Sequence, residues 1–366
     1  MQKTELSFST SVMNWFVKNG RHGLPWQKNP TGYRVWLSEV MLQQTQVKTV
    51  IPYYEKFTEK FSSVSKLAKA DLDQVLHLWT GLGYYTRARN LHKTANLIVE
   101  KHNSKFPDEV RELEQLPGIG KSTAGAIVSL AYNKKAPILD GNVKRVLSRY
   151  HAISAFPNST KAISKLWTIA EKSLPNSNFR SYTQAMMDLG ATVCTRSNPL
   201  CEKCPIAIKC TARIQNKIND FPGKKQSTIK KTAEIFIIII ENRSQQLLLI
   251  RRPPKGIWGG LWSFPEFSSE SEANNEIGSI LDSNIQFNKN WKAIEHKFSH
   301  FKLIMRPKHY SIEDTTNING KDDIMWVDKR KLKNIGVPAP VLKILENREE
   351  TIKETFDDRK SYVHQT

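Results

Sequence analysis

Four cysteines lie close together in the chain, and their spacing is typical of a metal site. They are Cys194, Cys201, Cys204 and Cys210, and the 366-residue chain has no others. Four thiolates that converge on one point hold either a tetrahedral zinc ion or a cubane iron–sulfur cluster. Zinc ribbons commonly use two separate CxxC pairs, whereas a single CxxC here is flanked by single cysteines, so the spacing favours iron–sulfur. Two disulfides are the weaker alternative, because the sequence has no secretion signal.

A glycine-rich turn between two predicted helices is the second motif that could do chemistry. Residues 116–124 read LPGIGKSTA, in which Gly118 and Gly120 permit positive φ angles and a close approach of the backbone to a ligand. The helix that follows directs free N–H groups outward, and Lys121 adds a positive charge. Such a turn can hold a phosphate without reading a base, although the same residues also suit an ordinary turn between helices.

Residues 1–220 are predicted to be mostly helical, because apolar residues recur at three- and four-residue steps. The clearest stretches are residues 33–50, 72–82, 90–102 and 163–174. Prolines and glycines such as Pro52, Gly81 and Pro117 are predicted to separate these helices. Helices of this length with short connections indicate an all-α domain.

The character of the chain changes at residues 222–232, which are basic, lack apolar periodicity and are predicted to form a linker. Beyond it, runs of β-branched and aliphatic residues between turn residues indicate an α+β domain. The predicted elements are strands at 233–240, 246–250, 296–307 and 323–327 and a helix at 273–281. The charged residues 346–366 are expected to form a tail.

The chain carries a formal net charge of +20, which suggests a polyanionic partner. Residues 1–225 hold 33 Lys and Arg against 16 Asp and Glu, whereas residues 226–366 hold 22 against 19. We therefore expect the polyanion to dock mainly on the first half. The longest apolar run, residues 235–240, is too short to span a bilayer. Because a signal peptide is also missing, we expect a cytoplasmic bacterial protein with no membrane partner.

Several motifs, in order along the chain, resemble those of the helix-hairpin-helix DNA glycosylases. The LPGIG turn is followed by LDGNVKRV at 139–146, and the cysteine spacing resembles the 4Fe–4S loop of the endonuclease III and MutY branch. The segments VWLSEVMLQQTQ at 35–46 and GLGYY at 81–85, and the second half of the chain, resemble the MutY-type adenine DNA glycosylases. The resemblance implies a 4Fe–4S cofactor and a base-excision-repair enzyme that flips out adenine and hydrolyses its N-glycosyl bond.

The domain arrangement follows from the motifs and the resemblance together. We expect an all-α helix-hairpin-helix glycosylase region at 1–221 with a cluster loop at 192–212, the linker at 222–232, an α+β Nudix-like domain at 233–345 and the tail at 346–366. The implied partner is double-stranded DNA that contains an 8-oxoguanine:adenine or guanine:adenine mispair. The chain is expected to be a monomer.

Two carboxylates fit the cleavage of an N-glycosidic bond, which needs a proton on the departing base and a negative charge near the sugar. Glu39 lies in the apolar stretch WLSEVML, where burial would raise its pKa and keep it protonated. Asp140 precedes a predicted helix, and an N-cap position favours the ionised form. The resemblance makes Glu39 the acid that protonates adenine and Asp140 the essential aspartate, supported by Asn142. Without it, a surface glutamate and a simple N-cap aspartate would be favoured.

Ser122 stands where bifunctional relatives of the endonuclease III kind carry a lysine, which forms a Schiff base and cuts the strand. Lys121 lies one position earlier, a rotation of about 100° around the helix, so its amine should point elsewhere. We therefore predict a monofunctional glycosylase with at most weak lyase activity, for which Lys144 is the available amine.

Gln43, Gln44 and Tyr84 are the candidates to fill the space that an extruded base leaves in the duplex. For Tyr84 the assignment depends on the match to GLGYY, because packing would otherwise be the favoured role. Arg87 and Arg89 follow, and we expect them to contact phosphates or to be solvated surface charges.

The second half resembles a Nudix domain without its magnesium site. WGGLWSFP at 258–265 resembles the start of a Nudix box region, but the next residues, EFSSESE, lack the REUxEExG glutamates that bind magnesium. We expect no hydrolase activity and a role in recognising 8-oxoguanine. Phe298, Ser299 and His300 match the FSH loop of the MutY-type family. Ser299 can donate and accept hydrogen bonds at the edge of the lesion, and Phe298 could insert beside it.

Two other functions are open at this stage. A relative directed at thymine or at oxidised pyrimidines is disfavoured by Ser122 and by the second domain. A non-catalytic iron–sulfur DNA-binding protein is disfavoured because binding alone requires neither Glu39 nor Asp140. Replacement of Asp140 by Asn separates a catalytic protein from one that only binds DNA, because only a catalytic protein would lose turnover while still binding DNA.

Overall fold

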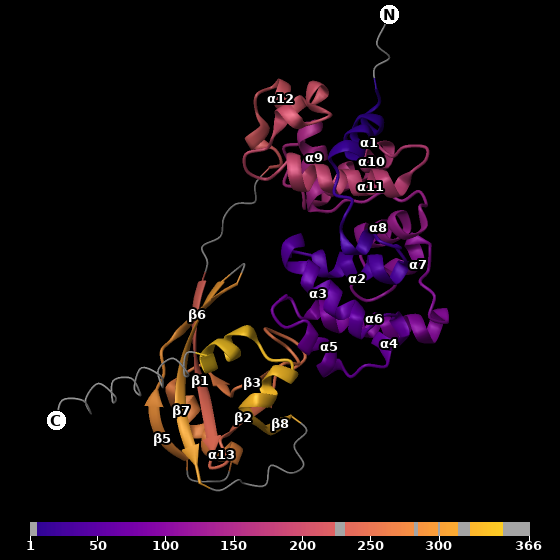
Figure 1. Cartoon of the computed structure of the whole chain (residues 1–366). Helices are drawn as coiled ribbons and strands as arrows, with labels where there is room; N and C mark the ends of the chain where they lie inside the picture. The colour runs from indigo at the N-terminus through magenta and orange to yellow at the C-terminus, as the bar shows by residue number, and fades with distance from the viewer. Residues whose placement is uncertain (1–5, 224–230, 282–284, 299–300, 314–322, 347–366) are drawn as a thin grey trace, which may run out of the picture. The chain divides into compact units, whose positions relative to one another are not determined.

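The computed structural model describes residues 6–223, 231–281, 285–298, 301–313 and 323–346. Contacts divide the chain into two compact units. Residues 1–69 with 90–227 form one, here called the helical unit, and residues 70–89 with 228–366 form the other, the β-rich unit. In Figure 1 the helices of the first run from indigo to pink, and the strands of the second are orange. The contacts thus place the short segment 70–89 with the second half of the chain.

The helical unit is all-α with short connections, as predicted. Several of its helices begin at Ser, Thr or Asp residues whose side chains accept a hydrogen bond from the first turn, which stabilises a helix start. The α-helices are α1 Phe8–Asn19, α2 Gly32–Leu42, α3 Val47–Lys60, α4 Val64–Ala68, α6 Thr86–His102, α7 Val110–Glu114, α8 Lys121–Tyr132, α9 Gly141–Tyr150, α10 Thr160–Lys172, α11 Phe179–Asp188 and α12 Thr211–Ile214. Shorter turns are η1 Pro25–Gln27, the π-helical η2 Leu189–Val193, η3 Cys201–Lys203, η4 Ala207–Lys209 and η5 Ile218–Asp220.

The predicted helix at residues 33–50 is wrong in one respect, because the structure divides it into α2 and α3. Gln43 ends α2 with ψ of 112°, and Gln44 has φ of 58°, so both leave the right-handed helical region. The prediction that Pro52 separates helices is also wrong, since Pro52 lies inside α3. Proline removes one N–H donor, but α3 continues through it because Val50, Tyr54 and Phe57 on its inner face are buried.

Packing around α8 determines where the chain leads to Asp140. α2 and α11 both pack against α8. A Cβ atom at Gly125 in α8 would lie 2.3 Å from the carbonyl oxygen of Pro137, so only glycine lets the segment before α9 cross the helix at this distance. The segment 137–140 is therefore held against α8, and Asp140 is presented at its end.

The β-rich unit contains one mixed sheet. Its main path is β3-β2-β1-β7-β5, with β4 paired to β1, β6 to β7 and β8 to β2. β1 and β7 are parallel and all the other pairs are antiparallel. The strands are β1 Lys231–Asn242, β2 Gln246–Arg251, β3 Trp262–Ser263, β4 Glu266–Phe267, β5 Ile285–Asn290, β6 Ile294–Lys297, β7 Phe301–Ile312 and β8 Ile324–Asp328. The helices are α5 Leu72–Leu78, α13 Glu270–Leu281 and the 3-10 helix η6 Lys329–Asn334.

The run of isoleucines in β1 reflects a strand that is buried on both faces. Ile237 and Ile239 belong to one apolar cluster, while Ile238 and Ile240 belong to a second cluster on the opposite face. Successive side chains of a strand point to opposite faces, so a continuous apolar run is what a central strand covered on both sides requires. The predicted hairpin of β1 and β2 is confirmed.

Part of the predicted organisation falls on residues that the structure does not describe. The predicted strand at 296–307 is in fact two antiparallel strands, β6 and β7, and the Phe298 N–H donates to the Phe301 carbonyl. Ser299 and His300, most of the predicted linker and nearly all of the predicted tail lie outside the described residues. No helix in the described parts of the chain has the length and apolarity to cross a membrane.

Candidate active site and cysteine cluster

Glu39 lies on α2 among side chains that are almost entirely apolar and buried, including Leu37, Val40 and Met41. Burial and, to a smaller extent, the negative charge of Asp140 together raise the pKa of the Glu39 carboxyl from 4.5 to about 8. A carboxyl group with this pKa keeps its proton at neutral pH. The structure therefore supports the expected acid and places it within electrostatic reach of the second carboxylate.

Asp140 is the N-cap of α9, as predicted. Its Oδ1 accepts a hydrogen bond from the Val143 N–H at 2.8 Å, and its Oδ2 accepts one from the Asn142 side-chain amide at 3.2 Å. The cap alone would lower the pKa of Asp140, but burial is the larger effect and raises it, while the Val143, Asn142 and Arg145 interactions lower it. The expectation that capping decides the charge is thus corrected, since capping only opposes the effect of burial.

The predicted glycine turn joins α7 to α8, and Ser122 in the first turn of α8 contacts the residue before Asp140. Gly118 has φ of +80°, which favours glycine. The Oγ of Ser122 accepts a hydrogen bond from the Leu139 N–H at 3.0 Å, directly before Asp140. The Nζ of Lys121 lies 4.4 Å from the centre of the Trp167 ring, a cation–π contact that directs this amine away from Ser122.

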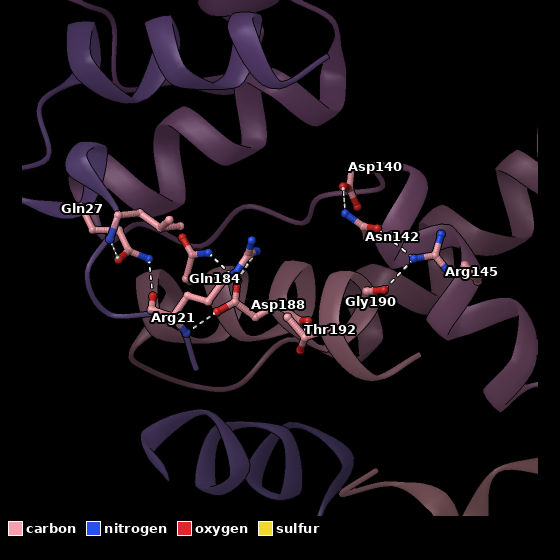
Figure 2. A network of polar contacts seen from close by, with 10 residues as sticks. Arg21, Gln27, Asp140, Asn142, Arg145, Gln184, Asp188, Gly190 and Thr192 are labelled. Carbon is pink, nitrogen blue, oxygen red and sulfur yellow. Dashed lines mark hydrogen bonds and ion pairs between the residues drawn. The ribbon is translucent and has the colours of Figure 1, made fainter. Parts of the chain in front are cut away.

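A chain of polar contacts runs from Asp140 through Asn142 and Arg145 to Gly190 (Figure 2). Asn142 donates to Asp140 and accepts at its own Oδ1 from Arg145 at 2.8 Å. Arg145 also donates to the carbonyl of Gly190 at 2.6 Å and, through Nε, to the carbonyl of Cys194 at 2.7 Å. The π-helical turn η2 approaches α9 so closely that a Cβ at Gly190 would lie 2.5 Å from the Asn142 Cβ.

The four cysteines line a common cavity, together with apolar residues of α9 and of the segment between the cysteines. All four thiols are free. Burial, with smaller contributions from the other three thiols, raises the pKa of Cys204 to about 12, so the four sulfurs lie close enough to influence one another electrostatically. No group of three or more His, Cys, Asp or Glu side chains within the described ranges is arranged to hold a single ion. Four cysteine thiols that line one cavity are the donor set of a tetrahedral zinc ion or of an iron–sulfur cluster.

Arg145 and Arg149 were not identified from the sequence, although both form part of this arrangement. Arg149 is buried, and it donates to Cys194 Sγ at 3.4 Å, to the Thr195 carbonyl at 2.6 Å and to the Phe221 carbonyl at 3.0 Å. The available signal was their spacing: two arginines four residues apart, on a helix that starts at Asp140, lie on one face.

A second buried carboxylate was also missed. Asp188 is fully buried in α11 and forms an ion pair with Arg21 at 2.6 Å. The Gln184 amide donates to the same carboxylate at 2.9 Å, and Gln27 donates to the Arg21 carbonyl at 2.7 Å. Figure 2 shows the side chains of Arg21, Gln184 and Asp188 directed toward one another. The contact is invisible in the sequence because 167 positions separate the two charged residues.

In the β-rich unit, Tyr84 is an exposed aromatic residue with φ of 50°. Arg87 does not lie on the surface, as both expectations for it required. It is buried, donates to the carbonyls of Leu82 and Gly83 at 3.1 Å each, and contacts the rings of Trp79 and Tyr84. The guanidinium thus supports the turn that presents Tyr84, because its Nη2 donates to two backbone carbonyls of that turn.

The other predicted contact residues are found at turns. Gln43 and Gln44 form the break between α2 and α3, where Gln44 is exposed. Phe298 stacks on Phe301 with the ring centres 4.5 Å apart and contacts Trp258 at 5.4 Å. Nothing in the described chain reports on Ser299 and His300.

The glutamates that follow the Nudix-like segment have protein partners. Glu266 forms an ion pair with Arg252 at 2.5 Å, Glu270 pairs with Lys308, and Glu272 accepts hydrogen bonds from Ser268. The expectation that this domain has no Nudix hydrolase activity stays a prediction.

Two family models match the chain. Residues 37–172 match the HhH-GPD superfamily of base excision DNA repair proteins, and residues 236–347 match the NUDIX domain. The first match contains Glu39, Ser122 and Asp140, and the second contains most of the sheet of the β-rich unit.

Similar proteins cover nearly the whole chain. An adenine DNA glycosylase of Buchnera aphidicola is 42% identical over 95% of this chain and 99% of its own length, and that of Rattus norvegicus is 31% identical over 94% and 78%. Among solved structures, a thermostable thymine-DNA glycosylase matches with a TM-score of 0.53 and 27% identity, over 57% of this chain and 95% of that one.

Proposed function

The chain belongs to the adenine DNA glycosylase family of base-excision repair enzymes, and on this premise we propose that it removes adenine mispaired with 8-oxoguanine or guanine in double-stranded DNA. Glu39 acts as the general acid, and Asp140 stabilises positive charge on the sugar. The observation that carries the proposal is the pKa of about 8 at Glu39, raised by burial and by Asp140. Two neighbouring carboxyls of which one holds a proton are the arrangement that glycosidic cleavage needs.

The proposed reaction begins when adenine is extruded from the duplex. Glu39 donates its proton to a ring nitrogen of adenine as the bond from that base to C1′ breaks, so the base departs neutral. The sugar takes on oxocarbenium character, which the ionised Asp140 stabilises. Water adds to C1′, and the proton it releases replaces the one that Glu39 gave up.

Asp140 is suited to this role because two donors fix its carboxylate. The Val143 N–H and the Asn142 amide direct both oxygens, and the Asn142 amide is itself held by Arg145. Groups fixed before the reaction need no reorientation when charge develops.

The enzyme is proposed to be monofunctional or to have only weak lyase activity. The hydroxyl of Ser122 supports the backbone at Leu139, and the amine of Lys121 lies over Trp167. The remaining nearby amine, on Lys144, donates to Asn158 at 2.8 Å. A Schiff base requires an amine at C1′, and these contacts direct both lysines elsewhere.

Cys194, Cys201, Cys204 and Cys210 would hold a 4Fe–4S cluster, with their thiolates as ligands. The cluster would secure the loop at 192–212 and neutralise the repulsion among the four sulfurs. Arg149 would donate to Cys194 from the adjacent helix, and hydrogen bonds of this kind orient ligands.

DNA is proposed to contact both units. Gly118, Gly120 and Lys121 offer the helix-hairpin-helix turn to a phosphate, and Gln43, Gln44 and Tyr84 occupy the space that the base vacates. The loop of Phe298, Ser299 and His300 recognises 8-oxoguanine. Arg87 contributes indirectly, by supporting the turn that carries Tyr84.

A strand-cleavage assay tests the proposal. Iron-loaded protein is incubated with duplexes that carry one 8-oxoguanine:adenine, guanine:adenine or 8-oxoguanine:cytosine pair, and half of each sample is treated with hot alkali. We expect cleavage of the adenine strand only after alkali, faster opposite 8-oxoguanine. Cleavage without alkali would refute the monofunctional assignment, and intact adenine strands in both halves would refute the adenine assignment.

A further inference from the structure

The segment 70–89 carries Tyr84 but belongs by its contacts to the β-rich unit. α5 opens the segment and packs against η6, which follows the last strand of the sheet. The turn that presents Tyr84 follows α5. The question is therefore what attaches this segment to a domain that lies about 150 residues later in the sequence.

The first attachment is an ion pair at the start of α5. The Asp73 carboxylate lies 2.7 Å from the Arg251 guanidinium, and about a third of each side chain is exposed. Arg251 is also held from the sheet side, since its guanidinium lies 4.6 Å from the centre of the Trp262 ring. A guanidinium fixed by an aromatic ring loses less conformational freedom when it binds a carboxylate.

The second attachment lies at the middle of α5. Leu76 is fully buried, and a Cβ at Gly336 would lie 3.0 Å from the Cβ of Leu76 and 3.2 Å from Leu261. The backbone at Gly336 is therefore packed directly on α5. Contacts this tight have no room for sliding, because folded interiors are close-packed.

The third attachment lies beyond Tyr84, at the far end of the segment. Arg89 donates to the carbonyl oxygen of Gly259, and burial lowers the pKa of its guanidinium. A Cβ at Gly259 would lie 2.5 Å from the Pro254 carbonyl oxygen, so the loop at 253–260 keeps this shape only with glycine. The segment is thus held on both sides of Tyr84.

A short path connects this third attachment to the loop assigned to 8-oxoguanine. Trp258 precedes Gly259, and its ring lies 5.4 Å from the ring of Phe298 and 5.5 Å from that of His296. Phe298 is the first residue of the FSH loop. Between Phe298 and Arg89 there is therefore one side chain, Trp258, and one peptide carbonyl, that of Gly259.

We infer that Asp73, Arg89 and Arg251 are positioning residues that make the β-rich unit the support of Tyr84, so that the loop which reads 8-oxoguanine and the aromatic side chain which enters the duplex act as one body. The inference rests on the proposed function, since it needs Tyr84 and Phe298 in the roles given above. Its consequence concerns specificity. Contacts between Phe298 and the lesion help to position Tyr84. An undamaged guanine makes fewer such contacts and therefore positions Tyr84 less well.

A double-mutant cycle on the Asp73–Arg251 pair tests the inference. Single-turnover rate constants are measured for 8-oxoguanine:adenine and guanine:adenine duplexes with the wild type, Arg251→Gln, Asp73→Asn and the double variant. We expect each single variant to lower the ratio of the two rate constants about fivefold, mainly through the 8-oxoguanine substrate. The double variant should be no worse than either single one, because the two residues act through each other.

Three controls separate the possible failures. Arg243→Gln removes an exposed ion pair with Glu313 in the same unit and should leave the ratio unchanged. Tyr84→Ala and Phe298→Ala should lower the ratio if the proposed function holds. If those two variants leave the ratio unchanged, or if the wild type shows no preference for 8-oxoguanine, the proposed function fails.

The inference alone fails if Tyr84→Ala and Phe298→Ala lower the ratio while the Asp73 and Arg251 variants do not. It also fails if the ion-pair variants lower the rate constants of both substrates equally and also lower the melting temperature. That result would indicate a general loss of stability. Additive effects in the double variant would likewise overturn it.

Discussion

Glu39 in the helical unit and Glu241 in the β-rich unit are both glutamates set among apolar neighbours, but they have different partners. Glu241 accepts from Lys329 at 2.7 Å and lies 3.0 Å from His309. Glu39 faces the negative charge of Asp140, and no cation of the described chain is among the interactions that shift its pKa. One glutamate is compensated by positive charge, and the other is compensated by keeping its proton.

This difference extends to the two regions around them. In the β-rich unit, Glu266, Glu270 and Glu295 are each paired with a cation. A buried carboxyl without a cation costs stability, so it is retained where a proton donor is useful. The paired glutamates of the second domain thus serve its structure, while Glu39 on α2 and Asp140 at the start of α9 are the carboxyls to which we assign the chemistry.

The largest expected effect comes from Asp140→Asn. The variant keeps an acceptor for the Val143 N–H but removes the negative charge, so adenine excision should fall about a thousandfold in a single-turnover assay. Binding to a duplex with an uncleavable adenine analogue should change little. Loss of binding together with loss of excision would contradict a role confined to the transition state.

Glu39→Gln should lower excision about a hundredfold or more, because an amide cannot donate the acid proton. In the wild type, excision should decline above a pH of about 8, where Glu39 ionises. The folded carboxyl binds its proton up to that pH, whereas an unfolded glutamate releases it near 4.5. Folding stability from this group therefore falls as pH rises between these values.

The same variant should consequently melt at a higher temperature than the wild type at pH 8, by a few degrees, with the difference vanishing near pH 4. Thermal unfolding at both pH values measures it. A variant that is less stable than the wild type at pH 8 would mean that the ionised Glu39 carboxylate has stabilising partners in the folded protein.

Glu241→Gln should have the opposite balance of effects. It leaves Lys329 and His309 without their carboxylate, so the free energy of unfolding should fall by about 1–2 kcal/mol, measured by denaturant unfolding. Excision from a guanine:adenine duplex should stay within twofold of the wild type. A large loss of activity would contradict the assignment of Glu241 to stability alone.

Arg243→Gln should have the smallest effect. Its pair with Glu313 is exposed on both sides, and solvent screens such pairs. The melting temperature should move by less than about 1 °C, and a larger shift would show that exposed pairs also matter to this sheet.

Much of the architecture was readable from the sequence because it depends on local patterns. Apolar periodicity separated the helical half from the sheet, and the LDGN segment predicted an N-cap at Asp140, which the structure has. The break at Gln43 and Gln44 was not readable, since the apolar pattern continues through it into α3. Nothing local in the sequence distinguishes a glutamine that continues a helix from one that ends it.

The sequence by itself determined which residues are available for chemistry: four cysteines at metal-site spacing, a glutamate in an apolar stretch, an aspartate before a helix, and a serine where an amine would be needed for strand cleavage. Only the tertiary structure decided the burial of these residues and which charges lie near them. It brought the charge of Asp140 to Glu39, buried Arg87 and Arg149, and placed Tyr84 with the sheet. The physical reason is that burial and charge act through space, between residues that are 72 positions apart in the case of Arg149 and Phe221 and 178 in the case of Arg251 and Asp73.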